Sequence, residues 1–185
     1  GLVFENFTVD GNYKNQKLAF AVFNTDHGKG FHNQIGLGNS HDPQYENVQD
    51  CIFRNLTLGN SYGDGIRIEG GSNLTFENIT SNFGGHDVIH LSTVKNADVS
   101  KIKVPNMKAN NVIRTRSSSY IDVHDCDCTN GAGYDTGAVF QSECITPNRE
   151  SRHIRYFNNV IRIIKGSGWY VVADQPASDI EIFDN

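Results

Sequence analysis

The chain of 185 residues is poor in cations and in long apolar runs, and each shortage excludes a class of partner. Its 16 Lys and Arg residues are outnumbered by 21 Asp and Glu residues, which gives a net charge of −5 and argues against a nucleic-acid partner. No apolar stretch approaches the roughly 18 residues that a membrane-spanning helix requires, so we expect no membrane span.

Proline and methionine are also scarce, with 4 and 1 residues, whereas Gly and Asn are abundant, with 18 and 21 residues. Asn and Gly tolerate left-handed backbone and weaken helix interiors. This composition favours short strands joined by tight turns. The length fits one domain, covering residues 1–185, that is large enough to bury a core.

A motif of apolar strand, Asn, apolar strand recurs along the chain. Clear copies lie at 2–9, 51–58 and 74–80, and weaker copies lie at 97–104, 121–128, 154–163 and 180–185. The central residues are at positions 6, 55, 78, 101, 125, 159 and 184, so the repeat is 23 to 25 residues long wherever no insertion intervenes. The longer intervals predict insertion loops at about 24–46 and about 129–137. A fixed period of this length indicates a solenoid.

A second strand follows most of these motifs, at 65–69, 88–92, 112–116, 139–143 and 170–173. Apolar and polar residues alternate with a period of two, and no helical period is present. The sequence therefore predicts an all-β fold, a right-handed parallel β-helix of about seven coils; leucine-rich repeats would need a Leu-rich consensus that is absent. Because the pattern is already running at Leu2 and still running at Phe183, we expect a slice of a longer solenoid.

Neighbouring coils of a β-helix stack about 4.8 Å apart, so equivalent residues form ladders. Two apolar ladders are predicted to point inward: one consists of Ile66, Ile89, Ile113 and Phe140, and the other of Leu56, Ile79, Ile102 and Cys126. The same alignment predicts that Cys51, Cys126 and Cys128 are reduced core residues. The central Asn of each motif fits a left-handed bend, and Lys101 interrupts that ladder.

Once the inward residues are fixed, the alternation fixes the outward ones. Two outward rows are predicted: Arg67, His90, Arg114 and Gln141, and Glu69, Ser92, Arg116 and Glu143. Such a face could hold an acidic sugar chain, because Arg binds a uronate carboxylate through two parallel hydrogen bonds. It could equally be a solvated face with ion pairs, such as Glu69 with Arg67 or Arg116.

Three short motifs precede or lie on these strands, one coil apart. They are Gly63-Asp64-Gly65-Ile66, Gly85-His86-Asp87 and Arg114-Thr115-Arg116. In order and spacing this set resembles the polygalacturonase-type glycoside hydrolases, part of the wider group of β-helical enzymes that includes pectate lyases. That family carries Asn-Thr-Asp, Asp-Asp, Gly-His-Gly and Arg-Ile-Lys motifs on successive coils, and Asn39-Ser40-His41-Asp42 could be a degenerate first motif. The Asn-rich coils also resemble disaggregatase-type enzymes, which cleave a chondroitin-like polysaccharide that holds archaeal cells together.

The resemblance implies an extracellular or cell-surface hydrolase of an acidic glycan, with paired carboxylates as acid and base. Gly63 replaces one Asp of the pair and Asp87 replaces a Gly, so the roles do not transfer intact. We expect Asp64 to be the acid, Asp42 or Asp87 the base, His86 to tune protonation, and Arg114 with Arg116 to hold a substrate carboxylate. Asp42 and Asp87 lie one coil on either side of Asp64, so their backbones are expected about two coil rises, or roughly 9 to 10 Å, apart. With the side chains leaning inward, this suits the carboxyl separation of an inverting enzyme.

Two alternatives remain open. One is a polysaccharide lyase, in which Arg114 or His86 abstracts a proton and Asp64 with Asp87 holds Ca²⁺. The other is a glycan-binding β-helix without catalysis, since fold does not imply function. The hydrolase requires no cofactor, and the His-containing loop at about 24–46 matches no compact metal-ligand spacing, so no metal site is predicted.

Overall fold

A computed structural model describes residues 1–12, 33–38, 48–60, 63–82, 86–107, 111–130, 138–144, 150–164, 166–173 and 175–185. Within these ranges every regular element is a strand, and the strands form one 16-stranded sheet. The strands are β1 (Val3–Glu5), β2 (Thr8–Asp10), β3 (Ile35–Gly38), β4 (Val48–Gln49), β5 (Ile52–Gly59), β6 (Ile66–Ser81), β7 (Asp87–Ser100), β8 (Lys103–Met107), β9 (Asn111–Arg116), β10 (Ser119–His124), β11 (Asp127–Asn130), β12 (Ala138–Cys144), β13 (Ser151–Phe157), β14 (Val160–Ile163), β15 (Ser167–Ala173) and β16 (Ala177–Phe183). The described part of the chain contains no helix with the length and apolarity that a membrane crossing requires.

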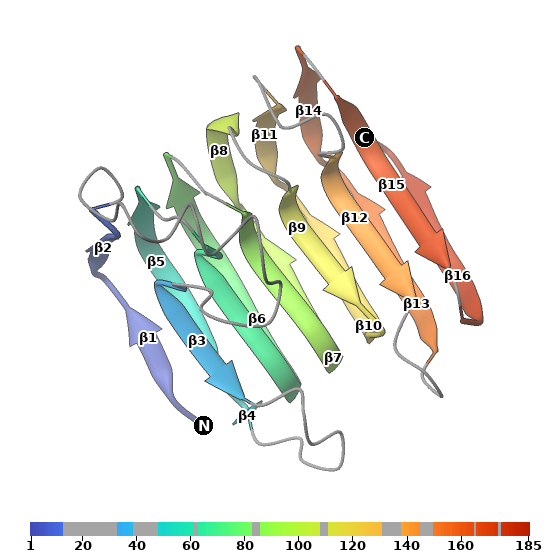
Figure 1. Ribbon diagram of the computed structural model, residues 1–185, viewed down its shortest axis with the longest axis horizontal. Coiled ribbons are helices and arrows are strands. Elements are labelled where there is room, and N and C mark those ends of the chain that lie inside the picture. Colours follow the sequence, from blue (N-terminus) through green and yellow to red (C-terminus); the bar gives the residue numbers. More distant parts are fainter. Residues whose placement is uncertain are drawn as a thin grey trace, which may run out of the picture.

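The sheet is a solenoid, because each strand pairs in parallel with the equivalent strand one coil away. In Figure 1 the colour advances from blue at one end to red at the other, so successive coils stack in chain order. The solenoid has three faces. The first contains 35–38, 66–69, 89–92, 113–116 and 140–143; the second contains 52–54, 74–77, 97–100, 121–124, 154–157 and 180–183; the third contains 57–59, 79–81, 103–104, 127–130 and 160–163.

The predicted fold class, an all-β parallel β-helix, is therefore confirmed. The described coils make about four turns, fewer than the seven coils predicted. The terminal levels are incomplete, since β1 and β2 supply two faces at one end and β15 and β16 supply two at the other.

The core consists of the two predicted ladders and a third, aromatic one. Ile66, Ile89, Ile113 and Phe140 are fully buried, as are Ile79 and Ile102, while Leu56 and Cys126 are nearly so. Phe4, Phe53 and Phe76 stack in successive coils with ring centroids 4.9 and 4.8 Å apart. Burial of like residues in register is thus what holds one coil on the next.

The bend between the second and third faces is left-handed at every level, as the central Asn of the motif predicts. The φ angles are 61° at Asn6, 55° at Asn55, 53° at Asn78, 55° at Lys101, 54° at Asp125, 53° at Asn158 and 52° at Asp184. The amide of Asn78 donates to the side-chain oxygen of Asn55 at 2.8 Å, and Asn55 donates to Asn6 at 3.1 Å. Lys101 keeps the bend, but its ammonium binds Glu77 in place of the Asn ladder.

One predicted bend position is wrong by a single residue. The left-handed residue is Asn158, whereas the predicted Asn159 is buried. Asn159 accepts a hydrogen bond from the backbone N–H of Cys126 at 3.0 Å and donates to the carbonyl of Val123 at 3.1 Å. Asn158 therefore forms the bend, and the adjacent Asn159 forms the hydrogen bonds to the neighbouring coil.

The predicted insertion at about 24–46 is not loop throughout. Within it, β3 pairs in parallel with Ile66–Glu69 and adds a strand to the first face. Its short apolar pattern, Ile35 and Leu37 between glycines, hid this strand from the periodicity analysis. The second predicted loop is shorter than expected at its start, since β11 extends to Asn130 and residues 131–137 lie outside the described ranges.

We expect Ile89→Asp to destabilise the fold by several kcal/mol, because Ile89 is fully buried and an unpaired carboxylate there would have no partner. Val160→Asp is the matched control, since Val160 is also β-branched and in a strand but is 50% exposed. Chemical denaturation measures both. A midpoint for Ile89→Asp equal to that of the control would contradict the inward register.

Cys51, Cys126 and Cys128 are free and buried, as predicted, and so is Cys144, for which no position was predicted. Burial raises the pKa of Cys126 to about 12 and the pKa of Cys128 also rises well above its ordinary value. We therefore expect thiol reagents to label these two cysteines in the native protein no faster than global unfolding exposes them. Mass spectrometry after a labelling time course, with denatured protein as the control, measures this; rapid native labelling would place them outside the core.

Candidate functional site

The two predicted outward rows are present in the predicted register. Arg67, His90, Arg114 and Gln141 are direct neighbours across the first face, and so are Glu69, Ser92, Arg116 and Glu143. The expected solvent exposure is wrong for half of them, and the other half are only partly exposed. His90 and Gln141 of the first row are buried, and so are Ser92 and Glu143 of the second. These polar groups therefore lie in a protected environment, on the side of the sheet away from the apolar core.

A column of polar side chains lies just before the strands of this face. It contains Asn33, Asp64, Asp87 and Asn111, one in each of four successive coils. In this column a side-chain oxygen of Asn33 accepts from the N–H of Asp64, Asp64 accepts from the N–H of Asp87, and Asn111 accepts from the N–H of Ala138, at 3.1 to 3.3 Å. Asn111 donates its amide to Asp87 at 2.8 Å. The four side chains of the column therefore link five coils, from that of β3 to that of β12, and its two central members are charged.

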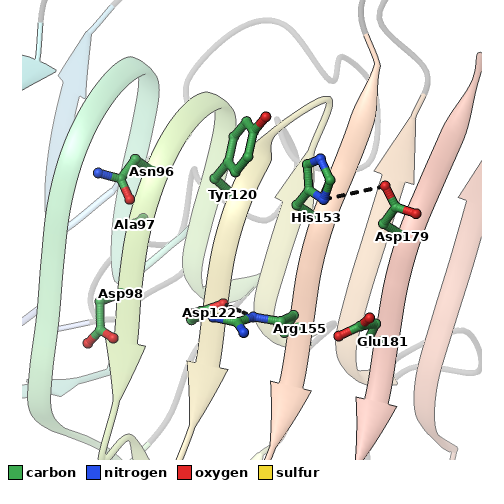
Figure 2. Close-up of a pocket in the computed structure, with 9 residues that line it drawn as sticks. All are labelled: Asn96, Ala97, Asp98, Tyr120, Asp122, His153, Arg155, Asp179 and Glu181. Carbon is green, nitrogen blue, oxygen red and sulfur yellow. Dashed lines mark hydrogen bonds and ion pairs between the residues drawn. The ribbon is translucent and has the colours of Figure 1, made fainter.

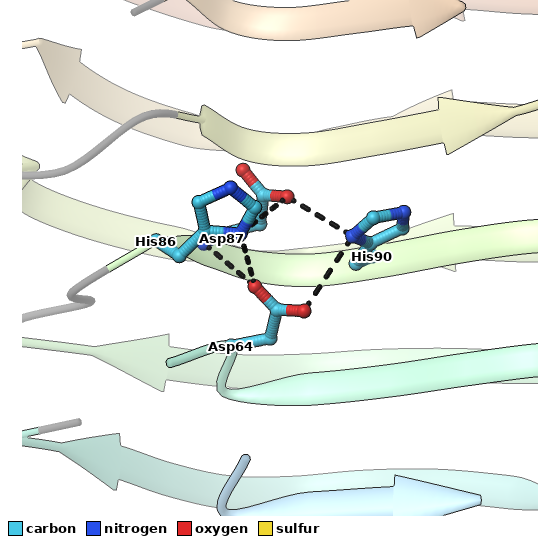
Figure 3. A group of neighbouring side chains, drawn as sticks. All are labelled: Asp64, His86, Asp87 and His90. Carbon is cyan, nitrogen blue, oxygen red and sulfur yellow. Dashed lines mark hydrogen bonds and ion pairs between the residues drawn. The ribbon is translucent and has the colours of Figure 1, made fainter. Parts of the chain in front are cut away.

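The two carboxylates of this column form a compact cluster with two histidines. One ligand atom from each of Asp64, His86, Asp87 and His90 lies within 4.8 Å of the others, and all four residues are buried. Figure 3 shows Nδ1 of both rings directed at the carboxylates. Nδ1 of His86 is 2.6 Å from Asp64 Oδ1 and 3.2 Å from Asp87 Oδ2, and Nδ1 of His90 is 3.2 Å from Asp87 Oδ2.

Arg67 and Arg114 flank this cluster from the neighbouring coils. A guanidinium nitrogen of Arg67 lies 2.9 Å from Asp64 Oδ2 and 3.1 Å from His90 Nδ1. Arg114 lies 3.5 Å from Asp87 Oδ2 and donates to Glu143 at 2.6 Å. Arg67 also donates to Glu69 at 2.7 Å, which is one of the ion pairs predicted from the sequence. Buried charges of both signs thus alternate along the face.

Burial alone would raise the pKa of Asp64, but hydrogen bonds and charge from His86 and His90 hold it well below its ordinary value. The pKa of Asp87 is also lowered, because the charge of His86 and a hydrogen bond to His90 outweigh burial and the repulsion of Asp64. Burial would lower the pKa of His86, yet the charge of Asp87 and the hydrogen bond to Asp64 raise it. Both carboxylates are therefore ionised at neutral pH, next to a basic imidazole.

These contacts determine which nitrogen of His86 exchanges protons. Nδ1 lies 2.6 Å from a carboxylate oxygen of Asp64 and 3.2 Å from one of Asp87, so it carries its hydrogen in both charge states of the ring. Nε2 lies 3.4 Å from a guanidinium nitrogen of Arg114. Nε2 is consequently the atom that gains and loses a proton, and Asp64 orients the ring as the acidic member of an acid–base dyad does.

Arg116 differs from the other two arginines of this face. Its side chain is half-buried, and no ion pair links it to any residue in the described ranges. Its Nε is buried without a hydrogen-bond partner, a feature that it shares with the Nε of Arg114. Burial and the charges of Arg114 and Arg67 lower its pKa, whereas the pKa values of Arg67 and Arg114 are raised. Arg116 stands between Ser92 and Glu143 in its row, and a guanidinium without an ion pair is a natural binding group for an anion.

The cluster does not fit a calcium ion. Ca²⁺ prefers oxygen ligands, whereas half of this donor set is imidazole nitrogen. The guanidinium groups of Arg67 and Arg114 already lie against both carboxylates, so cationic charge is supplied there by the protein itself. The Ca²⁺ considered for a lyase therefore has no support in these residues.

The sequence predicted most members of this site but not their surroundings. The structure brings together Asp64, His86, Asp87, His90, Arg67, Arg114 and Glu143, with Glu69, Arg116 and Gln141 around them. Asp42 lies outside the described residues. Asp64 was expected to be the general acid, but it is fully buried, and its lowered pKa is the opposite of what a general acid requires. Asn33 was missed because β3, the strand that begins two residues after it, was assigned to a loop.

Comparison of the chain with protein-family models, with curated proteins and with solved structures gave no match. The resemblance to polygalacturonase-type enzymes therefore remains a prediction from the motifs, and the function has to be argued from the side chains of the site.

The ionic cluster makes stability depend on pH in a defined way. Because the pKa of His86 is raised on folding, its contribution is complete below the pKa of an unfolded His and is lost as the pH rises through the folded value. Because the pKa values of Asp64 and Asp87 are lowered, their contributions are present above the unfolded carboxyl pKa and are lost as the pH falls through the folded values. The cluster is most stabilising between these two limits.

We expect Asp64→Asn to lower the pKa of His86 towards its ordinary value, because the variant removes the charged acceptor of Nδ1. The fold should persist, since Asn33 and Asn111 already serve the same column. NMR titration of the imidazole signals measures this. His124, whose pKa burial would lower but Asp98 and Asp125 raise, is the internal control and should titrate unchanged. An unaltered His86 titration would refute the dyad.

Proposed function

We propose that the chain is an enzyme that cleaves an acidic polysaccharide outside the cell or at its surface, with His86 as the group that transfers the proton. The observation that carries this proposal is the 2.6 Å contact between His86 Nδ1 and Asp64, which leaves Nε2 to exchange protons beside Arg114. A buried dyad of this kind is the usual arrangement for general acid–base catalysis.

The substrate class follows from the arginines. Arg116 has a guanidinium available for an anionic group, and Arg114 lies next to His86 Nε2. A uronate carboxylate bound by Arg116 would place a sugar ring on the first face, near the imidazole. Neutralising that carboxylate acidifies the hydrogen on the adjacent ring carbon, which is the proton that a base must remove in elimination.

Of the two expected reactions, the site favours elimination over hydrolysis. In elimination, neutral His86 Nε2 takes the proton from the carbon beside the carboxylate, a carbon–carbon double bond forms, and the bond to the glycosidic oxygen on the next carbon breaks. The leaving oxygen takes up a proton, so no water is consumed. The favoured mechanism needs no carboxylic acid and no metal ion, in keeping with the ionised state of Asp64 and Asp87.

Hydrolysis remains the second candidate because two carboxylates do lie together. It requires one protonated carboxyl group and one carboxylate, both in contact with the sugar. Asp64 and Asp87 have no exposed surface, and hydrogen bonds from protein groups hold both as anions. An inverting pair would also be roughly 6.5 to 9.5 Å apart, whereas oxygens of Asp64 and Asp87 lie within 4.8 Å.

Incubation with a panel of acidic polysaccharides tests the proposal. We expect products that absorb in the near ultraviolet, since elimination leaves a double bond conjugated with the carboxylate. His86→Gln should lower turnover by a factor of about 100 or more. The matched control is His124→Gln, which alters another histidine held by two carboxylates, Asp98 and Asp125, on the second face. New reducing ends without absorbance would establish the hydrolase instead.

Arg116→Ala should raise KM more than it lowers kcat, because Arg116 binds the substrate and does not move the proton. Arg162→Ala is the control, since Arg162 is an exposed arginine paired with Asp127 on the third face. Equal KM values for the two variants would remove Arg116 from substrate binding. The absence of any cleaved product across the panel would leave a binding module as the better description.

A further inference from the structure

A second polar surface lies on the second face, away from His86 and Asp64. It is a groove of about 590 Å³ across β7, β10, β13 and β16, with Tyr120 and His153 near its centre. Figure 2 shows two rows of side chains along it, one running from Asn96 through Tyr120 and His153 to Asp179, the other from Asp98 to Glu181. The rows follow from the register, because equivalent residues of four consecutive coils stand side by side.

Every residue of the first row has a left-handed backbone conformation. In the earlier coils this position holds Asp50, Asn73 and Asn96, with φ between 54° and 63°, and each Asn amide donates to the residue one coil before at 2.8 to 3.0 Å. Tyr120 has a φ of 58° at the same position. A bulky residue is strongly disfavoured in this conformation, whereas Asn is favoured. The fold alone would therefore select Asn, and the tyrosine requires another explanation.

Tyr120 presents an aromatic ring to the groove. Its side chain is 41% exposed, and its ring stacks on His153 at a centroid distance of 4.7 Å. Around it are groups that accept and groups that donate hydrogen bonds: Asp122 is held by two hydrogen bonds from Arg155, and Asp179 pairs with His153. Alternating donors and acceptors beside an aromatic ring suit a ligand that has apolar ring faces and many hydroxyl groups.

The charges that line the groove restrict the class of ligand further. Four carboxylates (Asp98, Asp122, Asp179 and Glu181) line it with a single guanidinium, that of Arg155, so an acidic sugar would be repelled. A cationic ligand over the tyrosine is also disfavoured, since the guanidinium of Arg152 already lies 5.6 Å from the centre of that ring. We propose that this groove binds neutral sugar residues of a glycan, with the part of the Tyr120 ring that His153 and Arg152 leave exposed as the apolar contact.

The proposal does not depend on the catalysis proposed for His86, because the groove shares no residue with that site. Isothermal titration calorimetry with cellohexaose, xylohexaose and mannohexaose tests it on the whole chain. We expect saturable binding of at least one of these and a loss of at least about tenfold in affinity in Tyr120→Asn. The thermal midpoint of that variant should stay the same or rise, because Asn restores the residue that the earlier coils carry.

Tyr170→Asn is the matched control, since Tyr170 is an exposed strand tyrosine outside the groove and its loss should leave affinity unchanged. His86→Gln should also bind the neutral sugars normally, which separates this site from the proposed active site. Failure of all three hexasaccharides to bind, or equal losses in Tyr120→Asn and Tyr170→Asn, would overturn the proposal. Binding of an acidic hexasaccharide that depends on Tyr120 would overturn it too.

Discussion

The stacking of equivalent residues in parallel coils is the constraint on which the rest of this structure depends. Because successive coils are only about 4.8 Å apart, each side chain has a neighbour at the same position in the next coil. Apolar residues gain from this arrangement, as in the ladder of Ile66, Ile89 and Ile113. Charged residues of one sign do not, and adjacent Asp64 and Asp87 repel each other. Their charges are tolerated because His86, His90 and the flanking arginines lie in the neighbouring rows.

The same constraint explains how much could be predicted from the sequence. Register follows from the repeat, so the inward ladders and both outward rows could be read from spacing alone. Burial on the outward side could not, because His90 and Glu143 have the same alternation as exposed residues would have. Nor could the protonation of Asp64 be predicted, since it depends on contacts with His86 and His90, whose ring orientations no periodicity encodes. The position of Asn33 was missed for a simpler reason, that β3 is too short to show alternation.

Some left-handed backbone positions carry a residue other than the Asn that this conformation favours. Along the bend from Asn6 to Asn78, Asn supplies both the backbone conformation and a hydrogen bond between coils. Lys101 in this bend and Tyr120 in the bend before the second face also have left-handed backbones, but neither makes the Asn hydrogen bond between coils. A different contact replaces it in each case. Lys101 pairs with Glu77 on the surface, so its substitution has a local electrostatic account. Tyr120 gains a stacking partner, His153, which also carries a left-handed backbone, and an open groove in front of it.

The polar column before the first face provides the strongest argument that its charges serve chemistry. Its structural task is to offer a side-chain oxygen to the next coil, and Asn33 and Asn111 perform it without a charge. Asn at positions 64 and 87 could do the same. Two aspartates there add two fully buried charges, each of which would be costly without the cations around it. This arrangement is unnecessary for the coil contacts, and it raises the basicity of one histidine beside an arginine. It therefore supports the proton transfer proposed for His86.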